Sequence, residues 1–381
     1  MVSLTDEQRM VLRTVRDLAE SEFADQAGTW DGELPWENAK ALAERGLYGI
    51  NFDERYGGGG LTELEAMMLI ETVGRVCPDT GYLLNTQLML APRAIEMFGS
   101  EALKERYLPP VVAGEDALQV AISEPHAGSD VGAMNTRLEE DDGDLYLSGE
   151  KIWVSDVPES SAAVVWTRFP DDSLGSVVMD FDADGVDVNE HYTNMAGHHQ
   201  THFFMDDVHI PEENVLTRGA EGFKEQLRAL NWERLGNAAM TNGMVAYAID
   251  AALAYAKGRE QFGRPIAAFQ GIEWKLAEMA TEFEASRALA YQAAERGVAN
   301  DRVPHRLDAS VATLFSAQMA ERVVSEALQV HGATGYQREH PLEYLYRFVR
   351  GWRIGAGTDE IQKNQIADAI KREGVPTLLE F

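Results

Sequence analysis

The residue best placed for acid–base chemistry in this chain is a glutamate on an apolar helical face. Glu233 shares that face with Leu230, Met240 and Met244, and the face should point inward. A carboxylate there is costly unless it has a partner or a raised pKa, and a general base that works near neutral pH needs a raised pKa. A partly exposed glutamate at the end of the apolar stripe, paired with an arginine, explains the pattern equally well.

A second candidate is the polar turn Ala121–Asp130, which begins as a predicted strand. Pro125 fixes φ and lacks an N–H, Gly128 permits a positive φ, and Ser129 can bond nearby backbone. Such a turn exposes backbone N–H groups and hydroxyls that suit an anionic or carbonyl-rich ligand, although many turns of this composition bind nothing. The segment Trp153–Ser155 follows shortly after it.

Three further patterns are weaker candidates for a site. His198, His199 and His202 lie close together, but adjacent strand residues face opposite ways, so a surface turn is favoured and no metal is predicted. Gln329–Gly335 places two glycines after a helix, which is typical of a helix C-cap. Gly355–Thr358 ends in a threonine that can cap the next helix, an arrangement that also suits a phosphate.

The composition is strongly acidic. Of 381 residues, 63 are acidic and 33 basic, and the formal net charge is −30. The acidic residues are spread along the chain, so we expect a hydrated acidic surface that repels nucleic acid and anionic membranes and favours a salt-adapted source. The single cysteine, Cys77, excludes an intramolecular disulfide. We find no signal-peptide pattern and no apolar run of membrane-spanning length, so a cytoplasmic location is expected.

Hydrophobic periodicity divides the chain into three predicted domains. Residues 1–115 form an N-terminal α-helical domain, residues 116–215 a central antiparallel β-barrel or sandwich, and residues 216–381 a C-terminal helical bundle, which makes an α+β multidomain protein. Strands and helices do not alternate, which argues against a Rossmann domain. The predicted strands are Leu118–Ile122, Leu145–Leu147, Ile152–Val154, Ala162–Thr167, Ser176–Phe181, Val186–Val188 and Thr201–Val208.

The order of these segments resembles the acyl-CoA dehydrogenase family, and the resemblance covers nearly the whole chain. Ala121–Asp130 looks like that family's flavin-holding strand end. Gly149–Ser155 looks like the strand that packs Trp153 and Ser155 against the flavin. Arg259–Pro265, with the Phe-Gln pair shortly after it, is similar to the segment that contacts the FAD diphosphate of a neighbouring subunit.

Two C-terminal segments complete the resemblance. Gln329–Ala333 and Thr358–Glu360 are similar to the family's remaining cofactor contacts, and five segments in register are far more specific than any one of them. The resemblance implies that FAD is bound by Val120, Ala121, Ile122, Ser123, Gly128, Ser129, Trp153, Val154, Ser155, Arg259, Gln261, Phe262, Gln270, Gln329, Val330, His331, Gly332, Ala333, Thr358, Asp359 and Glu360.

The resemblance also implies the fold and the reaction. The expected fold is a helical domain, a β-barrel and a four-helix bundle, assembled as a homotetramer (a dimer of dimers) with one FAD per subunit. The expected reaction converts an acyl-CoA thioester to its trans-2-enoyl product and passes electrons to electron-transfer flavoprotein. A carboxylate takes the α-proton, and hydrogen bonds to the thioester carbonyl acidify that proton.

The position of this carboxylate departs from the commonest family pattern. Many members have a base in a Tyr-Glu-Gly-Thr sequence before the last helix, where this chain has Gly355–Thr358. A minority branch, which includes isovaleryl-CoA dehydrogenases, has the base in a Leu-Asp-X-Glu-Arg-Leu sequence on a bundle helix. Leu230–Leu235 is similar to it, with Asn231 in place of the aspartate, so we predict Glu233 as the base.

The predicted substrate contacts surround this glutamate. The small residues Gly355 and Ala356 should leave room beside the reacting carbons, which favours a short or branched acyl group in fatty-acid or branched-chain amino-acid degradation. Asn231 leaves the details of CoA binding open. The residues predicted to contact substrate are Ser129, Leu230, Asn231, Arg234, Gly355 and Ala356.

Two alternatives stay open on the sequence alone. The same scaffold could support an acyl-CoA oxidase or a flavin monooxygenase, which differ in how they admit O₂; Glu233 favours dehydrogenation. A non-catalytic acyl-CoA-binding relative is the other alternative, and a purified protein without the yellow colour of a flavin would support it.

Overall fold

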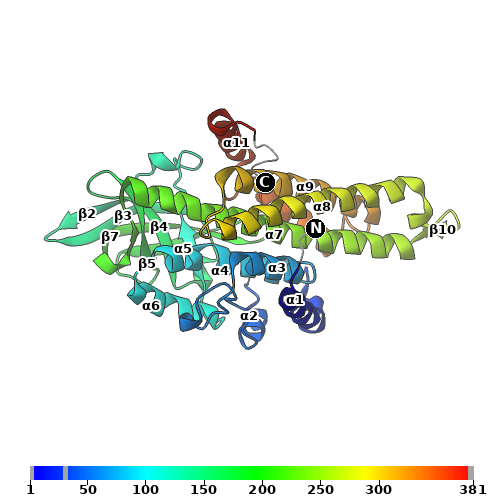
Figure 1. Ribbon diagram of the computed structural model, residues 1–381, viewed down its shortest axis with the longest axis horizontal. Coiled ribbons are helices and arrows are strands. Elements are labelled where there is room, and N and C mark those ends of the chain that lie inside the picture. The colour runs from blue at the N-terminus through cyan, green and yellow to red at the C-terminus, as the bar shows by residue number, and fades with distance from the viewer. Residues whose placement is uncertain (1–3, 29–32, 376–381) are drawn as a thin grey trace. The chain divides into compact units, whose positions relative to one another are not determined.

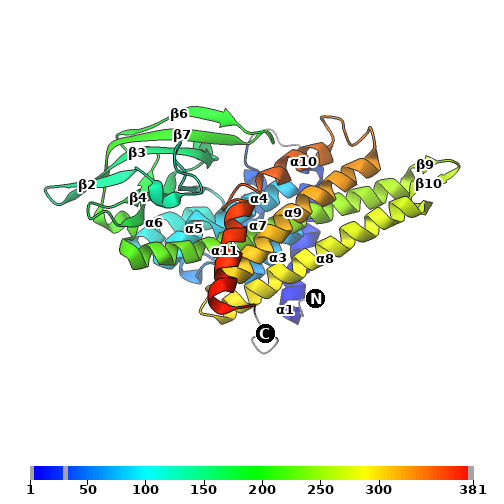
Figure 2. The same ribbon diagram turned by 90° about the horizontal axis from the view of Figure 1, so that it is seen from above.

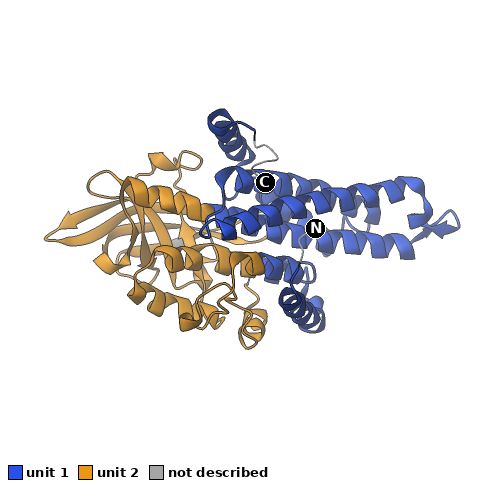
Figure 3. Ribbon diagram, viewed as in Figure 1, with its two compact units in different colours: residues 1–29, 67–81, 231–381 blue, residues 30–66, 82–230 orange. Residues whose placement is uncertain are grey.

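The computed structural model describes residues 4–28 and 33–375, and the chain forms two compact units (Figure 3). The bundle unit consists of Met1–Thr29, Met67–Gly81 and Asn231–Phe381. The sheet unit consists of Trp30–Ala66 and Tyr82–Leu230. Each unit is therefore built from segments that are far apart in the sequence.

The elements follow the predicted order of helices, strands and helices (Figures 1 and 2). The helices are α1 (Asp6–Leu18), α2 (Trp36–Ala43), α3 (Glu63–Gly74), α4 (Pro78–Met89), α5 (Ala91–Phe98), α6 (Glu101–Val112), α7 (Gly219–Gly258), α8 (Gln270–Ala299), α9 (Arg306–His331), α10 (Pro341–Gly351) and α11 (Asp359–Glu373). The strands are β1 (Leu118–Ala121), β2 (Arg137–Asp141), β3 (Asp144–Ser155), β4 (Ala162–Arg168), β5 (Leu174–Asp180), β6 (Val186–Thr193), β7 (His199–Ile210), β8 (Val215–Thr217), β9 (Glu260–Gln261) and β10 (Arg264–Pro265).

The sheet of the sheet unit is mixed, whereas the sequence predicted an antiparallel one. Its strands run in the order β6-β7-β3-β2-β4-β5-β8, and β1 pairs with β4. Leu118 pairs in parallel with Ala162, and the β2–β3 hairpin lies between these strands in the sequence. That connection is long enough for the crossover that parallel strands require. The remaining strand pairs are antiparallel, apart from one parallel pairing of β2 with β4.

Strand β4 is buried on both faces, which explains its continuous apolar sequence. Val164 and Trp166 pack into a cluster with α5 and α6, which includes Leu108. Val165, on the opposite face, packs into a second cluster with Phe203. A strand with both faces covered loses the alternation of apolar and polar residues that marks a half-exposed strand. Two strands were not predicted from the sequence: β2, which is rich in acidic residues, and β8, which is very short.

The bundle unit is organised around α9, which contacts α8, α10 and α11. Small buried residues such as Ala312, Ser316 and Ala320 line α9 and allow the neighbouring helices to approach. The helix α10 was not predicted. Among the described helices, none combines the length and the apolar character needed to cross a membrane.

Glycines allow α3, α4 and α7 to approach closely within the bundle unit. A Cβ added to Gly243 would lie 2.9 Å from the Glu71 carbonyl oxygen and 3.0 Å from the Gly74 Cα, and both of those are backbone atoms. Gly81 of α4 approaches Gly74 in the same way. A side chain at this crossing would force the helices apart.

We therefore expect Gly243→Ala to destabilise the protein by about 1–3 kcal/mol, as overpacking does in other cores. Gly271→Ala is the matched control, because a Cβ on this α8 glycine meets no atom within 4 Å. The control should be neutral or stabilising by about 0.5–1 kcal/mol. Urea unfolding of both variants measures the difference, and equal stabilities would contradict the close helix crossing.

Candidate functional site

Glu233 lies on α7 in the bundle unit as a half-buried carboxylate between fully buried neighbours, Trp232 and Leu235. In the described part of the chain, no hydrogen bond or ion pair joins its carboxylate to another side chain. Burial raises the pKa of Glu233 to about 7, and the nearby charge of Arg234 offsets only part of this rise. The carboxylate is therefore desolvated and lacks the arginine ion pair that would have made it purely structural.

The Arg234 guanidinium bonds to other residues of the bundle unit and not to Glu233. It donates to Asn231 Oδ1 at 2.9 Å, to Gln365 Oε1 at 3.1 Å and to the Ala356 carbonyl at 3.3 Å. The Asn231 amide in turn donates to the Pro304 carbonyl at 3.1 Å. Both residues are buried, so the structure supplies a positioning role for them, and their direct contact with substrate stays a prediction.

The side chains of Arg234 and Gln362 hold the loop before α11 in place by hydrogen bonds to its backbone carbonyls. Gln362 Nε2 donates to the carbonyls of Ala356 and Gly357, both at 3.1 Å, and so supports the same loop as Arg234. Ala356 has φ +56° and Gly357 has φ +98°, so the backbone turns sharply here. Gly355 is half-buried, and a Cβ on it would only touch the ring of Trp352 at 3.6 Å. The loop therefore presents small side chains from a fixed backbone.

In the sheet unit, a buried ion pair organises the turn Ala121–Asp130. Lys151 Nζ donates to Glu124 Oε1 at 2.8 Å and to the Ile122 carbonyl at 3.0 Å. The Glu124 carboxylate also accepts from the backbone N–H groups of Asn135, at 2.6 Å, and Thr136, at 3.0 Å. Burial by itself would raise the pKa of Glu124, but these hydrogen bonds and the charge of Lys151 outweigh it and hold the pKa below its ordinary value.

This ion pair was not predicted from the sequence. A lysine directly before the apolar residues Ile152–Val154, with a glutamate in the preceding turn, is a signal that could have found it. The Ile152 N–H donates to the Ser123 carbonyl at 2.9 Å and joins β3 to the turn a second time. Two motifs that are separate in the sequence therefore lie together in the sheet unit.

A β-bulge displays Trp153 at this junction. The register of β3 against β7 shifts between Lys151 and Val154, and Trp153 has φ +64°. Val154 packs into the sheet unit's second apolar cluster, whereas the Trp153 side chain is 52% exposed, with its ring centroid 5.3 Å from that of Tyr192. Bulges are common next to active sites because they re-aim a side chain, and this one turns a large flat indole outward.

The predicted flavin contacts in the turn offer both apolar surface and polar groups. Ala121 is buried, and Val120 and Ile122 pack against the first apolar cluster. Ser123 is half-buried and Ser129 is exposed, and no hydrogen bond of either hydroxyl is found within the described ranges. A Cβ on the exposed Gly128 would meet nothing within 4 Å. Leu230, on the sheet-unit part of α7, packs against the first cluster.

The predicted diphosphate segment forms the β9–β10 hairpin, which lies at one end of the bundle unit (Figure 2). Phe262 and Gly263 have positive φ, +53° and +76°, as a two-residue hairpin turn requires. Phe262 is 93% exposed. Arg259, Gln261 and Gln270 are also exposed, and no ion pair joins Arg259 to a carboxylate among the residues that are described.

The predicted contacts at the end of α9 are divided between buried and exposed positions. Val330 is buried, whereas Gln329, Gly332 and Ala333 are exposed. His331 stacks on Tyr255 with ring centroids 4.4 Å apart, and its Nδ1 lies 2.8 Å from the Ala327 carbonyl. A carbonyl only accepts, so Nδ1 carries the proton.

The predicted contacts at the start of α11 also include both buried and exposed residues. Thr358 caps the helix by accepting from the Ile361 N–H at 3.3 Å, and Glu360 is exposed. Asp359 is buried, and its Oδ2 accepts from Arg353 at 2.7 and 2.9 Å and from Gln318 at 2.9 Å. Its carboxylate therefore holds the loop to the bundle, and a cofactor contact would have to come from the backbone of Asp359 or from its neighbours.

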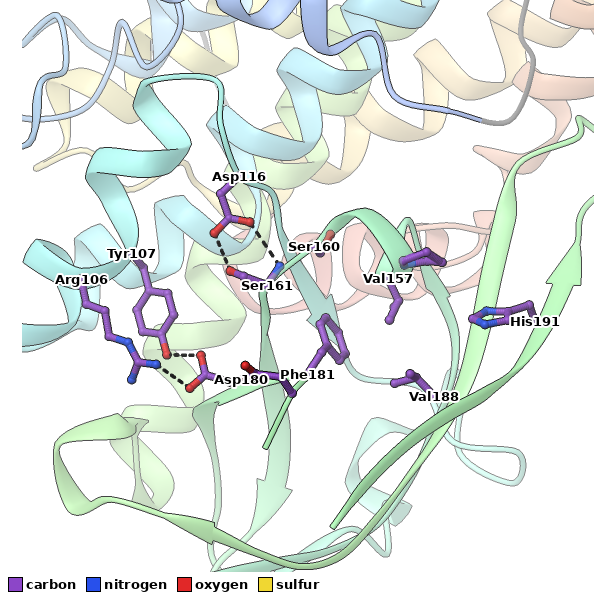
Figure 4. Close-up of a pocket in the computed structure, with 12 residues that line it drawn as sticks. Arg106, Tyr107, Asp116, Val157, Ser160, Ser161, Asp180, Phe181, Val188 and His191 are labelled. Atoms are coloured by element: carbon purple, nitrogen blue, oxygen red, sulfur yellow. Dashed lines mark hydrogen bonds and ion pairs between the residues drawn. The ribbon is translucent and has the colours of Figure 1, made fainter. Parts of the chain in front are cut away.

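A cavity of about 600 Å³ lies in the sheet unit near α6 and β5 (Figure 4). Asp180 accepts from Arg106 at 2.6 Å and from the Tyr107 hydroxyl at 2.7 Å, and Asp116 accepts from Ser161. With Asp182 also in its lining, the cavity has more carboxylates than guanidinium groups. Its negative charge disfavours a ligand with phosphates, so the cavity is a poor match for a nucleotide.

Three family models match the chain in the same order as its predicted domains. The acyl-CoA dehydrogenase N-terminal domain matches residues 5–115, the middle domain residues 119–208, and the C-terminal domain residues 220–371. A probable acyl-CoA dehydrogenase of Bacillus subtilis is 34% identical over 373 residues, which cover 96% of this chain and 98% of that protein.

Solved structures give the same result. Butyryl-CoA dehydrogenase from Megasphaera elsdenii superposes with a TM-score of 0.90 at 30% identity, covering 98% of this chain and 100% of its own. A chain in a structure of the electron transferring flavoprotein of Acidaminococcus fermentans has a TM-score of 0.91 at 30% identity, with 98% and 100% covered.

The raised pKa of Glu233 has a consequence for stability. The folded pKa of about 7 lies above the ordinary value of 4.5, so the folded state binds more protons than the unfolded state between these pH values. The contribution of this group to stability is therefore complete at low pH, falls as the pH rises through 7, and stays lost above it.

We expect Glu233→Gln to be more stable than the natural protein at pH 8 by about 1–3 kcal/mol, because each pKa unit corresponds to about 1.4 kcal/mol. The difference should shrink below pH 5. Thermal unfolding at both pH values measures it, with Glu278→Gln as an exposed control on α8. A stability difference that does not change with pH would show that the Glu233 carboxylate is not desolvated.

Proposed function

Because the chain belongs to the acyl-CoA dehydrogenase family, we propose that it is an FAD-dependent oxidoreductase that converts an acyl-CoA thioester to trans-2-enoyl-CoA. The observation that carries this proposal is Glu233, a desolvated carboxylate without a partner among the described side chains and with a pKa near neutrality. Such a group can accept a weakly acidic carbon-bound proton at physiological pH.

In the proposed reaction, Glu233 takes the proton from the α-carbon of the acyl group. With a pKa of about 7, a large fraction of Glu233 is ionised at neutral pH, and its conjugate acid is not too weak to release the proton later. Ionising Glu233 requires no broken ion pair, because Arg234 is bonded to Asn231, Gln365 and the Ala356 carbonyl. When bound, FAD supplies the acceptor for the hydrogen and electron pair that leave the β-carbon.

The residues of the sheet unit fit a flavin. The exposed indole of Trp153 offers a flat apolar surface, the hydroxyls of Ser123 and Ser129 are available to polar groups, and Gly128 leaves open space. In the bundle unit, the exposed guanidinium of Arg259 suits an anionic diphosphate. We propose the full predicted set for FAD, with the contacts at Asp359 made by its backbone.

We further propose a homotetramer, a dimer of dimers, with electron-transfer flavoprotein as the electron acceptor. Support for assembly comes from Phe262, Trp274 and Tyr336 of the bundle unit, which are 93%, 60% and 79% exposed. Large aromatic residues that are this exposed are typical of surfaces that bind another protein. Support for the acceptor comes from the similarity to a chain in a structure of electron transferring flavoprotein.

We propose a short or branched acyl group, as in the isovaleryl-CoA branch of the family. The position of the base within Leu230–Leu235 supports this branch. Hydrogen bonds fix the backbone at Ala356, and Gly355 and Ala356 have small side chains. A larger residue at either position would reduce the space that we propose for the acyl group. We also propose three domains bounded at residues 1–115, 116–215 and 216–381.

The base assignment is tested by Glu233→Gln. This variant should retain FAD and bind acyl-CoA, yet fail to bleach the flavin under anaerobic conditions, because an amide cannot accept the α-proton. Stopped-flow absorbance measures the bleaching, and Glu278→Gln, which changes an exposed glutamate of α8 outside the predicted contacts, should bleach normally. Combining Glu233→Gly with Ala356→Glu should restore part of the rate by moving the carboxylate to the neighbouring loop. Normal bleaching by Glu233→Gln would remove Glu233 from this role.

The proposed salt-adapted source is tested by stability. With a formal net charge of −30, the acidic residues of the folded protein repel one another in dilute buffer, and added ions screen this repulsion. We expect the unfolding temperature to rise steadily with KCl up to molar concentrations, whereas sucrose at equal osmolality should raise it less. Equal unfolding temperatures in dilute buffer and in molar KCl would argue against salt adaptation.

A further inference from the structure

The sheet unit contains a second buried carboxylate, Asp156, directly after the predicted flavin contact Ser155. Asp156 is 3% exposed and has φ +52°, so the chain turns inward here after the bulge at Trp153. The hydroxyl of Tyr82, from α4, donates to Asp156 Oδ2 at 2.6 Å, and Tyr82 is itself 4% exposed. The proposed reaction gives neither side chain a role.

The groups around Asp156 hold it in place without neutralising it. Ser160 Oγ donates to the Asp156 carbonyl at 2.8 Å. Glu159, from the same turn, adds a like charge, and its carboxylate accepts from the Trp36 indole at 2.7 Å. No lysine or arginine pairs with Asp156 in the described ranges. A buried carboxylate without a cation is costly, which makes a purely structural explanation unattractive.

Tyr82 connects this carboxylate to Ser155. The Ser155 side chain interacts with the Tyr82 phenol, and burial together with the charge of Asp156 raises the pKa of that phenol well above its ordinary value. Tyr82 therefore keeps its proton and donates a hydrogen bond to Asp156.

We propose that Asp156 and Tyr82 are positioning residues that set the reduction potential of the flavin bound at Trp153 and Ser155. The proposal rests on the proposed function, which places the flavin against these residues. A buried negative charge one residue from Ser155 opposes the addition of electrons nearby, because the low local dielectric screens it poorly. Asp156 should therefore lower the potential when it is ionised, and the hydrogen bond from Tyr82 favours that ionised form.

The test is an anaerobic dye-coupled titration of the flavin potential in the holoenzyme. Asp156→Asn should shift the flavin potential to more positive values at pH 8 by about 30 mV for two electrons. At a fixed solution potential, this shift changes the ratio of oxidised to reduced flavin about tenfold. Tyr82→Phe should shift it in the same direction, because loss of the hydroxyl favours protonation of Asp156. Asp182→Asn, which removes an exposed carboxylate of the same unit, should leave the potential unchanged.

The pH dependence separates a charge effect from a general disturbance. Burial raises the pKa of Asp156 to about 7, so the difference between the natural protein and Asp156→Asn should be large at pH 8 and small at pH 6. The other titratable groups facing this site are Tyr82, Glu159 and His198, whose ring meets Tyr82 edge-on at 5.1 Å. Repeating the series in His198→Gln should preserve the difference.

The outcomes distinguish this proposal from the proposed function. If Asp156→Asn and Tyr82→Phe bind FAD and leave the potential unchanged at both pH values, the residues are structural, while dehydrogenation by Glu233 stands. If Asp156→Asn does not fold, Tyr82→Phe alone decides, and an unchanged potential in it overturns the proposal. A natural protein that is purified without FAD and does not take it up would overturn both proposals.

Discussion

The buried ion pair between Glu124 and Lys151 is the constraint on which the proposed flavin contacts depend. It binds the turn after β1 to strand β3, and its hydrogen bonds to the Ile122 carbonyl and to backbone N–H groups satisfy both charges. Such a pair adds little net stability, but removing one partner leaves a buried charge that costs about 3–5 kcal/mol. The pair joins the turn to the strand that carries Trp153.

In the bundle unit, the neighbouring charged residues Glu233 and Arg234 do not form an ion pair with each other, in contrast to Glu124 and Lys151 in the sheet unit. Arg234 is buried and fully engaged in fixing the loop at Ala356, while Glu233, next to it in the sequence, is left without a partner among the described residues. Consecutive residues of a helix point about 100° apart, so one can support the loop while the other faces the proposed substrate. The cost of desolvating Glu233 is what gives the carboxylate a pKa suited to proton transfer.

The two carboxylates with a pKa near 7, Glu233 and Asp156, illustrate how the same shift serves different purposes. Burial is the main cause in both. Glu233 has no hydrogen-bond donor in the described part of the chain, so its lone pairs are free to accept a proton. Asp156 is buried and held by Tyr82, and in our proposal its charge acts through the field that it creates. In a chain with a net charge of −30, most other carboxylates remain hydrated at the surface.

The sequence by itself determined the succession of helices, strands and helices and the family, because hydrophobic periods and short motifs are local properties. It also placed Glu233 on an inward face, since helical spacing alone decides that. It did not reveal that Arg234 turns away from Glu233, that β1 pairs in parallel with β4, or that a bulge exposes Trp153. These features depend on contacts between residues that are distant in the sequence, and only the tertiary structure decides which of those contacts form. The pair of Glu124 with Lys151 belongs to the same class, because neither residue type specifies its partner until the turn and the strand are brought together.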